Sequence, residues 1–174
     1  MNENTTTPAF KKWFGDSKVV DVNGKPLVVY HGSKSKFKSF DLAKFGKTDA
    51  GWYGKGFYFT TDERVANLYG KEVIKAYLSL QKPMSSTMNG FSEGVLKNIV
   101  SYAEKVNPGL KISQQALTNA LDQRLALDQL ESLYRSAGHQ AEILAALTNI
   151  TGFDGVVDQS GTIYVAFHSE QIKF

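Results

Sequence analysis

The sequence predicts an α+β fold in which strands at both ends of the chain flank a helical middle. Residues 8–82 are dominated by short β-rich runs separated by glycine turns, and residues 89–149 carry apolar side chains at helical spacing. Residues 150–174 return to alternating apolar runs. Strands and helices segregated along a chain in this way are typical of α+β domains, in which the two ends meet in sheets.

The first block begins with a predicted β-hairpin, because residues 19–21 and 27–30 are β-rich and flank Asn23-Gly24, a strong turn signal. Residues 56–60 then predict a buried strand. Thr61 is the expected N-cap of a short helix over residues 62–69 that ends at Gly70. Residues 73–80 alternate as a strand that ends before Pro83.

The middle block, about residues 89–149, predicts three helices. They span residues 91–106, 113–136 and 139–149, with breaks at Asn107-Pro108-Gly109 and at Gly138. These helices either pack on the sheet or form an insertion that shapes a partner surface beside the site. In the last block, residues 153–157 and 162–167 predict a second hairpin. We expect one domain, residues 1–174, with this helical insertion.

Composition excludes several classes of protein. The chain has 174 residues, 42% hydrophobic and 21% charged, which is a soluble globular balance. It has no cysteine, which excludes disulfides, a thiol nucleophile and thiolate metal sites, and its three histidines are too scattered to predict a zinc site. No apolar run approaches the roughly 20 residues needed to span a bilayer. We therefore expect a cytoplasmic protein with no membrane partner and no metal.

Positive charge is concentrated near the start of the chain. Residues 10–55 contain ten lysines and four aspartates, whereas residues 89–149 contain five basic and six acidic groups. The first segment forms either an ordinary solvated surface or a surface that receives a phosphate-bearing ligand.

Two short motifs contain residues suited to a ligand site. Tyr30-His31-Gly32-Ser33 places an imidazole at the end of an apolar strand, next to a glycine that allows close approach of a ligand to the backbone. Tyr58 and Tyr69 lie on either side of a strand-to-helix return and are able to sandwich a flat cationic ring such as nicotinamide. Taken singly, each motif favours a structural interpretation, a histidine before a turn for the first and core aromatic residues for the second.

In this order, the motifs resemble the ADP-ribosyltransferase superfamily, in the branch with a His–Tyr–Glu signature. The first family motif is His-Gly-Ser/Thr, and the second is Gly-x-Gly-x-Tyr-Phe with a further tyrosine eleven residues on, a spacing that Tyr58 and Tyr69 keep. Residues 10–20 and 167–173 resemble the subgroup found within polyvalent proteins of phages. The resemblance implies split antiparallel β-sheets for residues 10–82 and 150–174 and does not include the helical block.

The resemblance also implies roles for individual residues, with NAD as the substrate. His31 would hydrogen-bond the adenosine-side ribose, Gly32 would bind the nicotinamide carboxamide through its backbone, and Ser33 would lie near that amide. Tyr58 would line the nicotinamide ribose site and Tyr69 would stack on the nicotinamide. Our own inference is that the pyrophosphate meets one of several lysines, among which the sequence does not choose: Lys34, Lys36, Lys47 and Lys55.

The sequence departs from the family pattern at two positions. Ala66 stands where many members have a serine that binds the amide. Aligning Phe167 and residues 171–173 with the family motif places Ile163 at the third signature position, where a glutamate is expected. A carboxylate there stabilises the charge that develops on the ribose and polarises an incoming hydroxyl, and isoleucine does neither.

Three hypotheses follow from Ile163. The first is a mono-ADP-ribosyltransferase whose acceptor supplies the missing negative group, as in similar His–Tyr–Ile members. The second is substitution by a nearby polar residue: Asp158, Gln159 or Glu170. The third is a pseudoenzyme that binds NAD or only a partner. The expected acceptor is a host protein, with nucleic acid as the alternative, and the family resemblance indicates a phage or bacterial effector or toxin.

Overall fold

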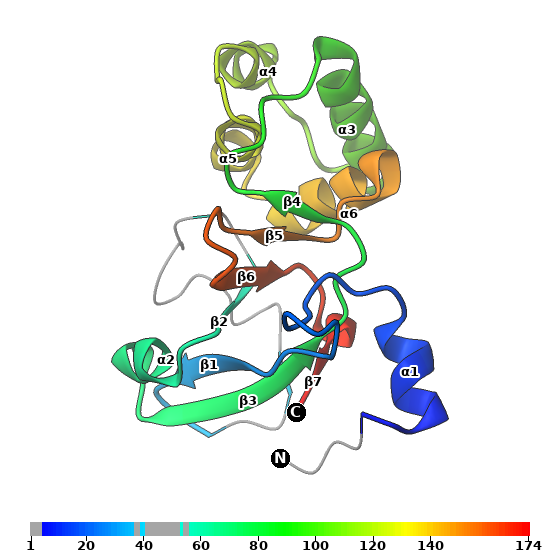
Figure 1. The fold of residues 1–174 in the computed structure, drawn as a ribbon. Helices are drawn as coiled ribbons and strands as arrows, with labels where there is room; N and C mark the ends of the chain where they lie inside the picture. The colour runs from blue at the N-terminus through cyan, green and yellow to red at the C-terminus, as the bar shows by residue number, and fades with distance from the viewer. Residues whose placement is uncertain (1–4, 37–38, 41–52, 54–55) are drawn as a thin grey trace. The chain divides into compact units, whose positions relative to one another are not determined.

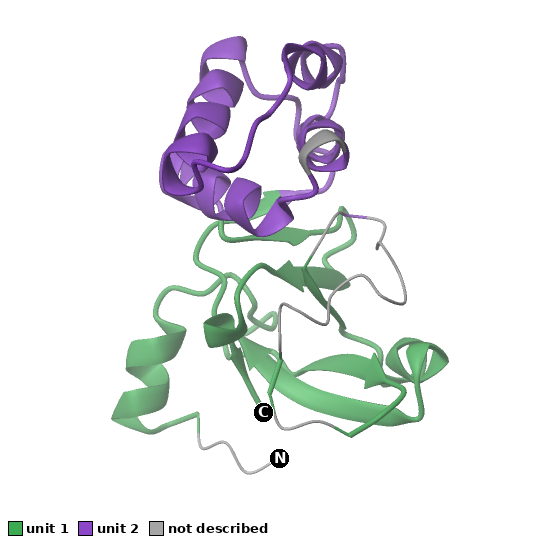
Figure 2. Ribbon diagram, turned by 180° about the vertical axis from the view of Figure 1, so that it is seen from behind, with its two compact units in different colours: residues 1–51, 55–84, 154–174 green, residues 52–54, 85–153 purple. Residues whose placement is uncertain are grey.

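The structure is a computed structural model that describes residues 5–36, 39–40, 53 and 56–174. The chain divides into two compact units (Figure 2). Unit 1 comprises residues 1–51, 55–84 and 154–174, and unit 2 comprises residues 52–54 and 85–153. The predicted α+β class is confirmed, because a sheet forms from the two ends of the chain and helices dominate its middle.

Unit 1 is built around a seven-stranded sheet (Figure 1). Its strands are β1 (Val29–Ser33), β2 (Phe57–Thr60), β3 (Glu72–Leu78), β4 (Pro83–Ser85), β5 (Gly155–Val157), β6 (Ile163–Ala166) and β7 (Ile172–Lys173). Their order is β4-β5-β6-β2-β1-β3-β7. The pairs β1–β2, β1–β3, β2–β6, β3–β7 and β5–β6 are antiparallel, as the resemblance implied.

The turns of both predicted hairpins are present. In the first, Gly24 has a φ of 74° and the Asp21 N–H donates to the Lys25 carbonyl at 2.8 Å, but a single Val20–Pro26 bridge replaces the expected pair of strands. The second hairpin joins β5 to β6 in the predicted place. The sequence therefore located both turns correctly, because each turn is encoded by neighbouring residues.

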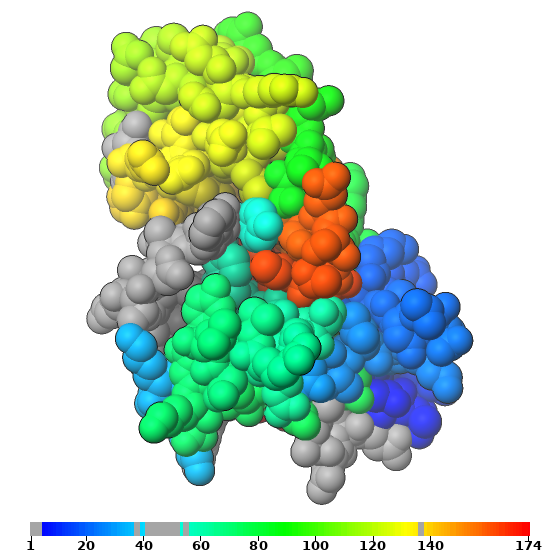
Figure 3. Space-filling view, turned by 60° about the vertical axis from the view of Figure 1, so that its left-hand side comes forward, coloured from blue at the N-terminus to red at the C-terminus, as the bar shows by residue number. Residues whose placement is uncertain are grey.

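The helices of unit 1 are short. Helix α1 (Pro8–Phe14), which the sequence analysis missed, begins where the Phe10 N–H donates to the Thr7 hydroxyl at 3.1 Å. Seven residues are too few for a clear helical period. Helix α2 (Glu63–Tyr69) was predicted, but Asp62 and not Thr61 is its N-cap, because the Asp62 carboxylate accepts from the Arg64 N–H. In Figure 3, α2 lies uncovered on the face shown.

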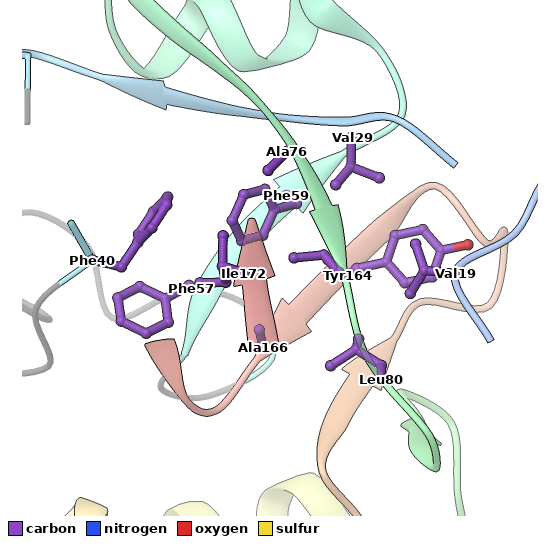
Figure 4. Packing of buried hydrophobic residues seen from close by; sticks show 11 residues of the cluster. Val19, Val29, Phe40, Phe57, Phe59, Ala76, Leu80, Tyr164, Ala166 and Ile172 are labelled. Atoms are coloured by element: carbon purple, nitrogen blue, oxygen red, sulfur yellow. The ribbon is translucent and has the colours of Figure 1, made fainter. Parts of the chain in front are cut away.

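The core of unit 1 lies on one face of the curled sheet, where side chains from β2, β3 and β6 meet (Figure 4). Alternation along the strands sets which residues enter it: Phe57 and Phe59 of β2 and Tyr164 of β6 are buried there. The intervening residues of the same strands, including Tyr58 and Ile163, consequently belong to the opposite face of the sheet.

Unit 2 contains α3 (Glu93–Val106), α4 (Gln114–Leu121), α5 (Ala126–Ala137) and α6 (Gln140–Thr151). The prediction of one helix over residues 113–136 is wrong, because α4 and α5 are separate. Between them the Arg124 carbonyl accepts from the Gly90 N–H at 2.8 Å, and the Ala126 N–H donates to the Met88 carbonyl at 3.0 Å. This pairing with a distant segment replaces the helical hydrogen bonds there. Within the described part of the chain, no helix has the length and apolarity needed to cross a membrane.

Candidate active site

His31 lies in the middle of β1 and reaches the neighbouring strand. Its Nδ1 atom lies 2.7 Å from the main-chain carbonyl oxygen of Tyr58. A carbonyl oxygen only accepts hydrogen bonds, so Nδ1 carries the proton. In the neutral ring this leaves Nε2 as the acceptor, and the imidazole is suited to receive a hydrogen bond from a hydroxyl group. The sequence alone does not determine this tautomer.

The surroundings of His31 favour its neutral form. The rings of Phe40 and Phe59 lie 5.1 and 5.5 Å from the imidazole, centroid to centroid. Burial lowers the pKa of His31 and outweighs the hydrogen bond to Tyr58, which acts in the opposite direction. This role of the two phenylalanines was not predicted, although strand alternation places Phe59 on the core face and could have indicated it.

Strands β1 and β2, both of which are fully described, are paired at Tyr30 and Thr60. The next residues on the same face, two positions beyond this pair, are Gly32 on β1 and Tyr58 on β2. The His31 side chain, which occupies the intervening position, bonds the Tyr58 carbonyl in this stretch. Next to the Tyr30–Thr60 pair, the His31 side chain therefore connects β1 to the main chain of β2, where the two signature motifs meet.

Gly32 is required by the packing of α2. A Cβ atom at Gly32 would overlap the carbonyl oxygen of Ala66 and would lie 3.2 Å from the Cβ of Tyr69. Helix α2 therefore packs directly on the β1 backbone, and Tyr69 is brought next to Gly32. Ala66, which stands where the family often has a serine, is buried, and its main-chain carbonyl forms this contact.

The remaining predicted residues of this site lie at the surface or near it. The Tyr69 side chain is 58% exposed, whereas Tyr58 is half-buried. The Ser33 hydroxyl donates to the Ser35 carbonyl at 2.8 Å and accepts from the Ser35 N–H, which forms a tight turn after β1. Its oxygen atom thus lies at the end of the strand that carries His31 and Gly32.

Ile163 begins β6 and lies directly opposite Thr60. Thr60 is in turn opposite Tyr30, so Tyr30, Thr60 and Ile163 form a row across β1, β2 and β6. Tyr58 lies two residues from Thr60 on the same face. Ile163 is half-buried and provides no acidic group in this row.

Comparison with known proteins identifies the family. The family of ADP-ribosyltransferases in polyvalent proteins matches residues 21–174. The chain belongs to this family. The match runs through the helical block, which the motif resemblance alone did not cover, and it begins after residues 10–20.

Two further comparisons do not extend this assignment to the family. No curated protein matches the chain. One solved structure, described as the crystal structure of an anti-CRISPR protein, is 13% identical with a TM-score of 0.38. The alignment covers 84% of this chain and 93% of that chain.

Asp158, the first of the three candidates to replace the missing acid, forms hydrogen bonds within the β5–β6 turn. Its Oδ1 atom accepts from the N–H groups of Thr162 and Ile163, both at 2.7 Å, and Oδ2 accepts from the Ser160 hydroxyl. Burial raises the pKa of Asp158, but these hydrogen bonds together lower it by more than burial raises it, so the net shift is downward. The carboxylate thus fixes the turn before Ile163.

The other two candidates lie outside the Ile163 row. Gln159 is exposed within the same turn. Glu170 belongs to the 3₁₀ helix η2 (Ser169–Gln171), where its main-chain carbonyl accepts from the indole of Trp13 at 2.8 Å. The structure thus places Gly32, Tyr58 and Tyr69 near one another on the face of the sheet that also carries Ile163. The His31 side chain lies on the core face against Phe59 and contacts Tyr58 only at its main-chain carbonyl.

The lysines proposed for the pyrophosphate are only partly described. Lys34 and Lys36 follow β1 and are exposed, whereas Lys47 and Lys55 lie outside the described residues. The described part of the chain contains no group of three or more acidic or histidine side chains able to hold a metal ion.

Proposed function

We propose that this ADP-ribosyltransferase family member transfers a single ADP-ribose from NAD to a macromolecular acceptor, and that the acceptor is a host protein. The observation that carries the proposal is the arrangement of His31, Gly32 and the two signature tyrosines, in a chain that belongs to this family. We further propose that it acts as a phage or bacterial effector in the cytoplasm of a bacterial cell.

The residues present suit the chemical groups of NAD. The neutral His31 offers an acceptor nitrogen to a ribose hydroxyl, and Gly32 allows a carboxamide to approach the main chain of β1. Tyr69 exposes an aromatic ring beside Gly32, and Tyr58 follows on β2. Stacking of such rings on a cationic pyridinium contributes on the order of 1–2 kcal/mol.

The proposed reaction breaks one bond and forms one. The bond between C1′ of the ribose and the nicotinamide nitrogen breaks, and its electron pair leaves with nicotinamide. An acceptor atom forms the new bond to C1′ and, if it carries a proton, releases it to solvent. Positive charge develops on the ribose between these events, and Ile163 offers no lone pair to stabilise it.

Ile163 therefore favours transfer of one unit to an acceptor that brings its own negative charge. A carboxylate acceptor needs no base to remove a proton, whereas a ribose hydroxyl does. Elongation into a polymer is not expected, because nothing in the Ile163 row activates the hydroxyl of a bound ADP-ribose. The same isoleucine also favours a second candidate, a pseudoenzyme that binds NAD or a partner without turnover.

One experiment separates these functions. The purified chain is incubated with NAD and bacterial lysate, nicotinamide release is measured by chromatography, and modified proteins are identified by intact-protein mass spectrometry. We expect nicotinamide release and the addition of one ADP-ribose unit to an acceptor. Nicotinamide release without a modified macromolecule indicates hydrolysis by water, modified nucleic acid indicates the alternative acceptor class, and no release supports the pseudoenzyme.

A further inference from the structure

Helix α2 has an unusual distribution of apolar side chains for a helix packed on a sheet. Ala66 is buried against β1, but Val65, Leu68 and Tyr69 are exposed by 37%, 83% and 58%. These three residues are spaced i, i+3 and i+4, so they lie along one side of the helix. Single apolar residues scattered over a surface are common, whereas a contiguous stripe of exposed large apolar residues on one short helix indicates a binding surface.

Positive charge lies at the C-terminal end of the same helix. Lys71 follows Gly70, and the backbone nitrogen of Lys34 lies 2.7 Å from the position of a Cβ on Gly70. Lys36 follows two residues later. All three lysines are exposed, and none of them forms an ion pair in the part of the chain that the structure describes.

Acidic side chains near α2 do not neutralise this charge. Asp62 and Glu63 lie at the other end of the helix, where they pair with Arg64 at 2.8 Å and with Lys75 at 3.6 Å. Glu72 is paired in register with Ser33, and it is a single carboxylate beside three lysines. The surface therefore combines an apolar stripe with a net positive end.

We propose that this surface, the α2 docking face, holds an acidic segment of the acceptor protein. The face is defined by Val65, Leu68, Tyr69, Lys34, Lys36 and Lys71. The lysines match carboxylates by charge, and Leu68 and Val65 offer apolar contact that a nucleic acid backbone does not use. Arg64, the residue type best suited to phosphate, is engaged by Asp62.

The docking face is continuous with the candidate active site through Tyr69. The Cβ of this residue lies against Gly32, and the residue as a whole is exposed, as are its neighbours Leu68 and Val65 on the same helix. A protein bound along α2 is thereby held next to the place proposed for the nicotinamide. The reason for holding an acceptor there rests on the proposed transferase function, but binding itself does not.

The test measures binding of defined probes to the full chain by fluorescence anisotropy. The probes are a labelled peptide of alternating glutamate and leucine, the same peptide with serine in place of leucine, the same peptide with lysine in place of glutamate, and a single-stranded DNA. The variant is Leu68→Ser/Lys71→Glu, and the matched control is Val106→Ser/Lys111→Glu, which changes an exposed valine and an exposed lysine of unit 2. NAD binding is followed in parallel by calorimetry.

We expect the glutamate–leucine peptide to bind the native chain best and to lose about tenfold in affinity with the α2 variant but not with the control. NAD binding stays unchanged in both variants. Equal binding of the peptide to native chain and α2 variant, no binding to the native chain, or tighter binding of DNA overturns the proposal. Absence of NAD binding by the native chain contradicts the proposed function instead and leaves the peptide result interpretable.

Discussion

The imidazole of His31 donates through Nδ1 to the main-chain carbonyl of Tyr58, 27 residues along the chain, at 2.7 Å. This contact joins the two signature motifs of the family and also fixes the tautomer of the ring. A chemical role for His31 therefore depends on a backbone atom of the other motif, and several of the predictions below test this relationship.

Replacement of His31 by alanine removes both the acceptor nitrogen and the contact with Tyr58. We expect nicotinamide release to fall about 10- to 100-fold, because a lost hydrogen bond with an unsatisfied partner costs on the order of 1–3 kcal/mol. The control is His139→Ala, which changes a histidine of unit 2. Full NAD turnover by His31→Ala contradicts the assignment of the site.

The pH dependence of the reaction follows from the lowered pKa of His31. Burial disfavours the imidazolium, so the pKa lies below the usual 6.5 and the ring is neutral at pH 7. As the pH falls through this pKa, Nε2 gains a proton and stops accepting a hydrogen bond, so NAD turnover decreases. A pH–rate profile of the native chain and of His31→Gln tests this, and an acid limb that persists in the variant belongs to another group.

The same shift affects stability. The unfolded chain takes up a proton on this histidine at a higher pH than the folded chain does, so the contribution of neutral His31 to stability is complete above about pH 6.5. It is lost as the pH falls through the lowered pKa. Denaturant unfolding measured as the pH is lowered from about 7 to about 5 will show a smaller loss of stability in His31→Gln than in the native chain.

Gly32→Ala tests the contact between α2 and β1. The added methyl group overlaps the Ala66 carbonyl, so α2 must shift, at a cost of about 1–3 kcal/mol in the free energy of unfolding. NAD binding should weaken as well. In the control Gly94→Ala, the new methyl group meets no atom within 4 Å and the helix gains about 0.5–1 kcal/mol. Similar changes in the two variants would show that α2 does not pack as described.

Ile163→Glu tests the third signature position. A carboxylate opposite Thr60 offers negative charge to the developing positive centre, so NAD hydrolysis should rise about tenfold or more. Ile163→Gln is the matched neutral variant and should not produce this increase. If glutamate leaves hydrolysis unchanged in a folded protein, Ile163 does not occupy the position of the catalytic acid.

Asp158→Asn distinguishes a structural from a chemical role for this residue. Asparagine retains one acceptor oxygen for the Thr162 and Ile163 N–H groups, whereas alanine retains none. We expect Asp158→Ala to lower the free energy of unfolding by about 1–2 kcal/mol and Asp158→Asn by less. NAD turnover by folded Asp158→Asn should stay near the native rate, and a loss of a hundredfold or more (two powers of ten, about 2.8 kcal/mol) would assign Asp158 the role of the missing acid.

Local features of the fold were predictable from the sequence, and long-range ones were not. The turns at Gly24 and at residues 158–161 are encoded by adjacent residues. The predicted start of α2 was one residue too early. The break between α4 and α5 was missed, because it depends on pairing of Gly90 with Arg124. Helix α1 was missed for a different reason: like α2 it has seven residues and shows no clear period, so only its ends, Thr7-Pro8 and Gly15, mark it in the sequence.

The sequence by itself determined the strand–helix–strand order, the motifs with His31 and the two tyrosines, and the isoleucine at the expected position of an acid. Each of these is a matter of residue identity and spacing along the chain. Tertiary structure alone decided the tautomer of His31, the need for Gly32 beneath α2 and the commitment of Asp158 to a turn. These properties depend on which backbone atom faces each side chain, and folding brings such atoms together from distant parts of the chain.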